Sequence, residues 1–262
     1  MSVKRCPMCT VAKEVVSSHL MPAALYDYCR PPGGNPVSFN TRLVIESSRQ
    51  MQFPLLCGGC EDILNKGGER WILPLFARLD GSFPFHDLLT KMAPAVVDGD
   101  AKLYAVAKNP DIDTEKLAHF AMGIFWKAAI HSWRGDETDP LIDLGMHTEP
   151  IRNYLQSKQP FPAEMLLKIG VLPTPVRHIA FNAPYQGSSV KWRNFIFYVL
   201  GIEFTLLIGK DLTKDQLAAS FTGNSERPIL LVNFERSVQD IAVDVMKKAH
   251  KAQNVEKYLK KP

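Results

Sequence analysis

Cys6-Pro7-Met8-Cys9 and Cys57-Gly58-Gly59-Cys60 are two cysteine pairs with the same spacing, separated by 47 residues. Each Cys-x-x-Cys turn can point two thiolates at one ion, and the two glycines of the second pair free the backbone to bend tightly. Four thiolates complete a tetrahedral Zn²⁺ site with no open position for a substrate, so the predicted site is structural. The alternatives are two unrelated pairs of reduced thiols or a redox-active pair. Cys29 is left over and is expected to be a buried thiol.

The residues between the two pairs predict a small α/β module. Val15-Val16 is expected in a strand, and Pro22 is suited to open a short helix. Residues 37–45 and 51–56 read as the two arms of a hairpin, and a helix is expected to begin at Cys60. A cysteine turn, a strand, a hairpin and a helix that carries the last two ligands follow one another in the order of a treble-clef zinc module.

This order of residues resembles a known group of nucleases. Cys6-x-x-Cys9, Ser18-His19-Leu20-Met21-Pro22 and Leu56-Cys57-x-x-Cys60 together resemble the zinc-stabilised branch of the HNH endonuclease superfamily, the ββα-metal nucleases. The resemblance covers residues 4–75. It implies an endonuclease that cuts DNA or RNA with Mg²⁺ or Mn²⁺, in a setting such as phage defence or mobile elements.

The resemblance also implies roles for individual residues. His19 is at the position of the general base, which takes a proton from the water that attacks a phosphodiester. Asn40 is the best match, and Asn35 a poorer one, to the family's mid-motif Asn that orients this base. The helix after the last cysteine offers three groups that could bind the divalent metal: Glu61, Asp62 and Asn65.

Two departures from the family pattern keep a second interpretation open. Ser18 stands where an acidic or His metal ligand is usual, and no His follows Cys60 on the expected helix. The alternative is therefore a non-catalytic, zinc-stabilised module that binds nucleic acid or protein. In that case His19 is a loop or capping residue, and Glu61-Asp62 only complements the helix N-terminus. Glu69-Arg70-Trp71 is expected to supply helix surface and a core Trp, with a role in the site as the alternative.

The remaining two thirds of the chain predict a second, mixed α+β domain. A turn-rich joint at residues 79–84 places the boundary between a zinc module over 1–80 and a domain over 81–262. Helices are expected over residues 117–133, 151–157, 162–168 and 237–259. Strands are expected over residues 102–108, 176–182, 191–200, 202–208 and 229–234. The predicted fold class is thus α+β, with an N-terminal four-cysteine treble clef and a long final helix. The second domain carries no recognisable chemical motif. Its possible roles are binding of a protein partner and formation of a homo-oligomer.

Composition narrows the class of protein further. With 262 residues, 46% of them hydrophobic, and a formal charge of +4, the chain is globular rather than disordered or collagen-like. The longest apolar stretch, residues 195–208, is too short and too interrupted to span a membrane, which predicts a cytoplasmic protein without a membrane partner. Residues 236–262 hold seven basic and three acidic residues. This basic end could contact a nucleic-acid backbone, or could simply suit a solvated helix terminus.

Overall fold

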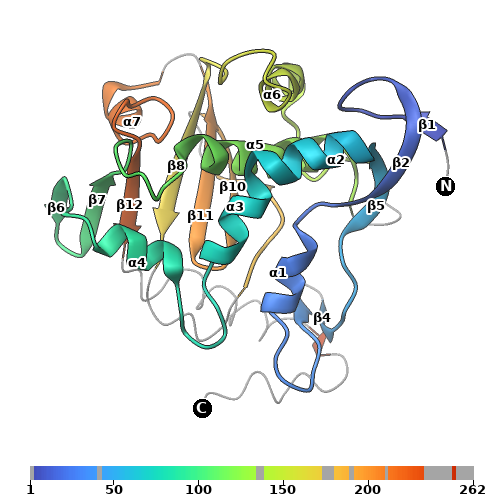
Figure 1. Cartoon of the computed structure of the whole chain (residues 1–262), viewed down its shortest axis with the longest axis horizontal. Helices are drawn as coiled ribbons and strands as arrows, with labels where there is room; N and C mark the ends of the chain where they lie inside the picture. The colour runs from blue at the N-terminus through green and yellow to red at the C-terminus, as the bar shows by residue number, and fades with distance from the viewer. Residues whose placement is uncertain are drawn as a thin grey trace.

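The computed structural model describes residues 3–39, 43–133, 139–172, 180–188, 192–209, 212–232 and 250–251. In these residues the chain is a mixed α+β protein with one large sheet, two small sheets and helices packed between them (Figure 1). The predicted α+β class is therefore confirmed. Among the described residues, none of the helices is long and apolar enough to cross a membrane.

The large sheet has the strand order β6-β7-β12-β8-β11-β10-β9. Its strands in chain order are β6 (Val96–Asp98), β7 (Ala101–Ala105), β8 (Met165–Val171), β9 (Tyr185–Gln186), β10 (Arg193–Val199), β11 (Ile202–Ile208) and β12 (Pro228–Val232). All neighbours are antiparallel except β12 and β8, which run parallel at the centre.

Helix α5 (Thr114–Ile130) covers one face of this sheet (Figure 1). The Asp113 side chain caps its first turn by accepting a hydrogen bond from the Lys116 amide. Phe120 and Phe125 pack their rings against Phe197 of the sheet. The helix predicted over 117–133, with residues 113–116 at its start, is thus present: it begins directly after the Asp113 cap and ends at Ile130, three residues before the predicted end. The other helical segments of this part are α4 (Pro84–Thr90), the 3₁₀ turn η3 (Gly145–His147), α6 (Thr148–Leu155) and α7 (Lys214–Ala218).

The residues of the predicted zinc module form the small sheet β1-β2-β5 and a helical run that follows it. Its strands are β1 (Val3–Arg5), β2 (Ala12–His19) and β5 (Gln52–Cys57). The helical run consists of α2 (Gly58–Leu64), the π-helical turn η1 (Asn65–Glu69), α3 (Arg70–Ile72) and the 3₁₀ turn η2 (Leu73–Leu75).

A second small sheet lies beside this module, with the order β13-β4-β3. It contains β3 (Val37–Phe39), β4 (Leu43–Glu46) and β13 (His250–Lys251), and the short helix α1 (Ala23–Tyr28) precedes it. The hairpin predicted between residues 37–45 and 51–56 is wrong, because β4 pairs with β3 and β13 while β5 pairs with β2. The β2–β5 pairing sets Cys57 opposite Val15 and so brings the second cysteine pair back to the first.

Three predictions in the second part of the chain need correction or lie outside the described residues. Of the strand expected over 176–182, residues 176–179 lie outside the described residues, and residues 180–182 hold only an isolated bridge between Phe181 and Val199. The helix expected over 162–168 is wrong, because residues 165–171 form strand β8 with both faces largely buried. A strand covered on both faces is apolar at nearly every position, and its periodicity resembles that of a short buried helix. The final helix expected over 237–259 lies outside the described residues except for β13, which is a strand.

One hydrophobic core connects the residues of the predicted zinc module to the rest of the described chain. It extends without a break from Cys6 and Leu64 through Phe120 to Ile229. Gly68 lets η1 pack closely against α5, because a Cβ atom at that position would lie 2.5 Å from the carbonyl oxygen of Lys116. The division at residue 80 stays a prediction, although the two predicted parts share this core.

Candidate metal centre and the surroundings of His19

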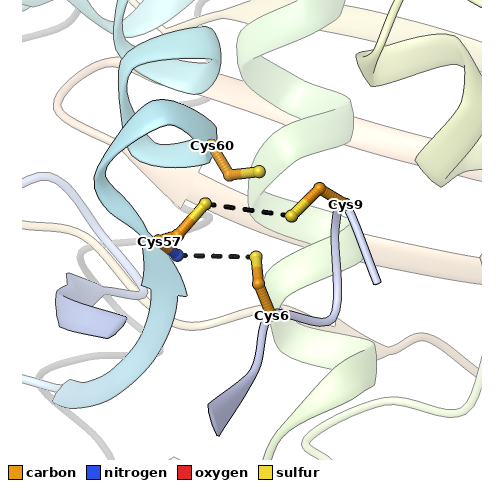
Figure 2. Close-up of side chains that lie close together, drawn as sticks. All are labelled: Cys6, Cys9, Cys57 and Cys60. Atoms are coloured by element: carbon orange, nitrogen blue, oxygen red, sulfur yellow. Dashed lines mark hydrogen bonds between the residues drawn. The ribbon is translucent and has the colours of Figure 1, made fainter. Parts of the chain in front are cut away.

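The four cysteines of the two pairs converge on one point (Figure 2). Their sulfur atoms all lie within 4.8 Å of one another, and the sulfurs of Cys9 and Cys57 are 3.9 Å apart. Zn²⁺ with tetrahedral Zn–S bonds of about 2.3 Å separates its ligand sulfurs by about 3.8 Å. The spacing and the all-thiol donor set therefore fit a Zn²⁺ ion held by Cys6, Cys9, Cys57 and Cys60.

Local backbone geometry prepares each cysteine for this role. Cys6 and Cys9 occupy the turn between β1 and β2, which is closed by hydrogen bonds from the Cys6 amide to the Val11 carbonyl and from the Thr10 amide to the Cys6 carbonyl. Cys57 ends β5, and its amide faces the Cys6 sulfur at 3.4 Å. Cys60 then follows in the first turn of α2. An amide that points at sulfur stabilises a thiolate, as is usual around zinc-bound cysteines.

The surroundings shift the pKa values of two of these thiols in opposite directions. The backbone amide of Val11 is the main cause that lowers the pKa of Cys9 to about 7. Burial raises the pKa of Cys60 instead. A bound cation would stabilise all four thiolates, because a coordinating thiol is deprotonated by the metal.

The first cysteine turn also contacts helix α6. The carbonyl oxygen of Met8 accepts hydrogen bonds from the Arg152 guanidinium and, at 3.0 Å, from the Gln156 amide group. Glu149 holds the same guanidinium in an ion pair. The Met8 side chain is fully buried, so the turn is anchored through both its backbone and its side chain.

His19 is the last residue of β2 and lies opposite Gln52 of β5. Its side chain is half-buried, and its carbonyl oxygen accepts a hydrogen bond of 2.8 Å from the Nζ of Lys127 on α5. The same ammonium lies 3.0 Å from Oε1 of Glu69 on η1. The Lys127 ammonium thus links the carboxylate of Glu69 to the backbone of His19.

The three predicted metal-binding groups on the helix have different surroundings. Glu61 has a buried Oε1 without a hydrogen-bond partner, whereas Asp62 is exposed and forms an ion pair with Lys66 at 2.6 Å. Asn65 is exposed at the start of η1. Among the described residues, the group of metal-ligand type that comes together is the four cysteines. The catalytic roles of His19, Glu61, Asp62 and Asn65 stay predictions.

Two further predicted positions can be placed or set aside. Asn40 lies outside the described residues. Asn35, the poorer candidate, is exposed, and its backbone amide donates to the Glu46 carboxylate at 2.9 Å. Ser18 is completely buried, and its Oγ accepts a 3.0 Å hydrogen bond from the Leu56 amide. Ser18 therefore supports the β2–β5 pairing.

The sequence did not single out Lys127, and it predicted Glu69 as a helix-surface residue with a role in the site only as the alternative. Lys127 lies three residues after Ile124, on the stripe of α5 that also holds Phe120 and Ala128, and all of these side chains are buried. A lysine at a core position of an apolar helix was the available signal, since lysine is almost never fully buried unless paired. Its partner Glu69 comes from a segment 58 residues earlier in the chain, so no local pattern indicates the pair.

Comparison of the chain with protein-family models, with curated proteins and with solved structures found no significant match to any of the three.

Proposed function

We propose that this protein is a zinc-stabilised, HNH-like endonuclease that hydrolyses phosphodiester bonds in DNA or RNA. The observation that carries the proposal is the arrangement of β2, β5 and α2. Strand β2 pairs antiparallel with β5, β5 leads directly into α2, and the four cysteines close one end of this unit. His19 ends the first of these strands, as the treble-clef form of a ββα nuclease requires of its base.

His19 would act on the attacking water in this scheme. Its half-buried imidazole would take the proton of the water as the new P–O bond forms, and a solvent water would give a proton to the leaving oxygen as the old bond breaks. Mg²⁺ or Mn²⁺, when bound, would supply charge stabilisation at the scissile phosphate. The buried, unpartnered Oε1 of Glu61 is the hard oxygen donor that best supports such a site on the helix. The four cysteines stay structural, since their ion has no open position.

A cleavage assay on single- and double-stranded DNA and RNA, with Mg²⁺ or Mn²⁺ added to the zinc-loaded protein, tests this proposal. His19→Ala is expected to lower kcat by about 10²- to 10⁴-fold, the usual contribution of a general base. His86→Ala is the matched control, because His86 is also only half-buried but lies on α4, on the opposite side of the molecule from β2 and β5 (Figure 1). Equal cleavage by wild type and His19→Ala, or cleavage by neither, would contradict the nuclease proposal.

A non-catalytic role in nucleic-acid binding is the second candidate, and Ser18 favours it. The resembled family usually has a metal ligand at this position, whereas the Ser18 hydroxyl is buried and accepts the hydrogen bond of the Leu56 amide. The module would then present basic residues to phosphates without cutting them. Salt-dependent retention of DNA or RNA by both wild type and His19→Ala, without cleavage, would be the result that selects this function.

A further inference from the structure

Lys127 is a charged side chain in an apolar part of the core. Only 1% of the side chain is exposed to solvent, and its neighbours along α5, from Phe120 to Ala128, are buried hydrophobic residues. Two acceptors surround its ammonium: the His19 carbonyl oxygen at 2.8 Å and Glu69 Oε1 at 3.0 Å. Glu69 is itself only 14% exposed.

Stability alone does not account for this lysine. Withdrawing two charges from water costs free energy that their attraction only partly offsets, and a well-packed apolar pair of similar volume is often as stable or more so. The neighbouring core positions of α5 already hold such apolar side chains. A buried ion pair therefore calls for a geometric explanation at this position.

The contacts of the ammonium supply that explanation. It joins the end of β2, where His19 leaves the sheet, to η1, which continues the helix that bears Glu61 and Asp62. Its own backbone is held as well, because the indole Nε1 of Trp133 donates to the Lys127 carbonyl at 2.9 Å. On the other side of His19, the side chains of Leu20 and Met21 are completely buried. The main chain at His19 is thus fixed from both directions.

We propose that Lys127 is a positioning residue for His19: its ammonium sets the strand end that carries the base against the helix that carries the acidic groups. The proposal rests on the proposed nuclease function. It adds a residue from α5, outside the segment that resembles HNH enzymes, as a part of the same site. Lys127 acts through the His19 backbone and does not touch the reacting atoms.

The test compares three variants of the full-length, zinc-loaded protein. Lys127→Met/Glu69→Gln removes both charges together, so that it leaves no buried charge without a partner, and Lys127→Met alone serves as a more severe form. Lys116→Met is the matched control, because Lys116 lies on the same helix but is 42% exposed and pairs with Asp113 at the surface. Zinc content and the thermal transition first establish that each variant folds.

Two readouts then separate positioning from stability. The first is the ¹Hε1–¹³Cε1 signal of His19, recorded with labelled histidine and assigned by its loss in His19→Ala. We expect a clear displacement in the folded double variant and none in Lys116→Met. The second is cleavage, for which we expect kcat to fall about 10- to 100-fold with KM nearly unchanged, as for a catalytic group displaced by about 1 Å.

The outcomes distinguish this proposal from the nuclease proposal. A wild-type protein that does not cleave nucleic acid overturns the nuclease function, and the His19 signal still decides whether Lys127 positions that residue. An unchanged His19 signal in the folded double variant overturns the positioning role. Failure of the double variant to fold with zinc bound also overturns it, because the pair would then serve the fold itself.

Discussion

The hydroxyl of Ser18 supports the backbone, at a position where the resembled nucleases usually carry a metal ligand. Its Oγ is completely buried and accepts the hydrogen bond of the Leu56 amide across the irregular step between β2 and β5. At a bulge the regular ladder is interrupted, and a side-chain acceptor satisfies the amide that the ladder leaves over. The residue before His19 therefore contributes to the position of the strand end.

Ser18→Ala is expected to destabilise the protein by about 1–3 kcal/mol, because the Leu56 amide would be left buried without an acceptor. Ser17→Ala is the control, since Ser17 is exposed and makes only a 3.3 Å contact with Gln52, and a change below about 0.5 kcal/mol is expected there. Chemical denaturation of the two variants measures the difference. Equal stabilities would show that water or a shifted backbone satisfies the amide.

The predictability of individual residues depended on whether a short motif marks them. Four cysteines in two short motifs of the same spacing predicted their convergence, because each motif supplies two ligands to one ion. Lys127 and Glu69 could not be paired in this way, because their contact depends on how α5 packs on η1. Proximity of Glu69 to His19 is likewise a product of tertiary structure.

At the scale of elements, the helical run α2–η1–α3 approaches α5 closely at two consecutive glycines. A Cβ at Gly67 would lie 2.2 Å from the His119 ring, and one at Gly68 would lie 2.5 Å from a backbone oxygen and 2.6 Å from a backbone nitrogen of α5. The His119 ring can move, whereas the backbone of a packed helix cannot do so without displacing its neighbours. Both glycines lie within the π-helical turn η1.

Gly68→Ala is expected to lower stability by about 1–3 kcal/mol or more, since the added methyl group meets the α5 backbone. Gly59→Ala is the matched control on the same helical run. Gly59 lies in α2 without a positive φ, so the tight bend expected from the sequence does not require a glycine there. No atom lies within 4 Å of its new Cβ, and an alanine reduces the freedom of the unfolded chain. Thermal unfolding should therefore show a lower transition for Gly68→Ala only. Similar transition temperatures for the two would argue against a tight α5–η1 contact.

Elements with strong local signals were predicted well, and the pairing of strands was not. The apolar stripe of α5 and the long apolar stretch that holds β10 and β11 identified those elements from sequence. The partner of β5 was missed, because its pairing with β2 spans the α1, β3 and β4 segments and no turn residue announces it. Strand β8 was read as a helix for the related reason that a strand buried on both faces shows no alternation.

At the scale of the whole molecule, the cysteine centre is built into the common core. Cys6, Cys57 and Cys60 belong to the same buried cluster as the apolar residues of α5 and of the large sheet. Apparent zinc-binding energies of about 10–16 kcal/mol are similar to or larger than the total stability of a typical domain, about 5–15 kcal/mol. We therefore expect the metal ion to be released in the same transition in which the core unfolds.

Removal of zinc with a strong chelator should abolish the cooperative thermal transition or lower it strongly, and calorimetry with metal analysis should find about one ion per folded chain. Cys29→Ala is the control that should keep its zinc, because Cys29 lies outside the cluster and burial raises its pKa to about 12. Less than about half an ion per chain with the four ligand cysteines intact would refute the zinc site. An unchanged transition after metal removal would refute its structural role.

The hydrogen bonds between Met8 and α6 have a consequence for the order of events during synthesis. Gln156 follows Met8 by 148 residues, so a ribosome working at about 5–20 residues per second makes the helix roughly 7–30 s after the turn. Cys57 and Cys60 emerge much sooner, and ion capture can join the two turns before the surface that covers them exists. In the nascent chain the metal would then act as a temporary substitute for the missing core, holding the first residues in register until α5 and α6 arrive.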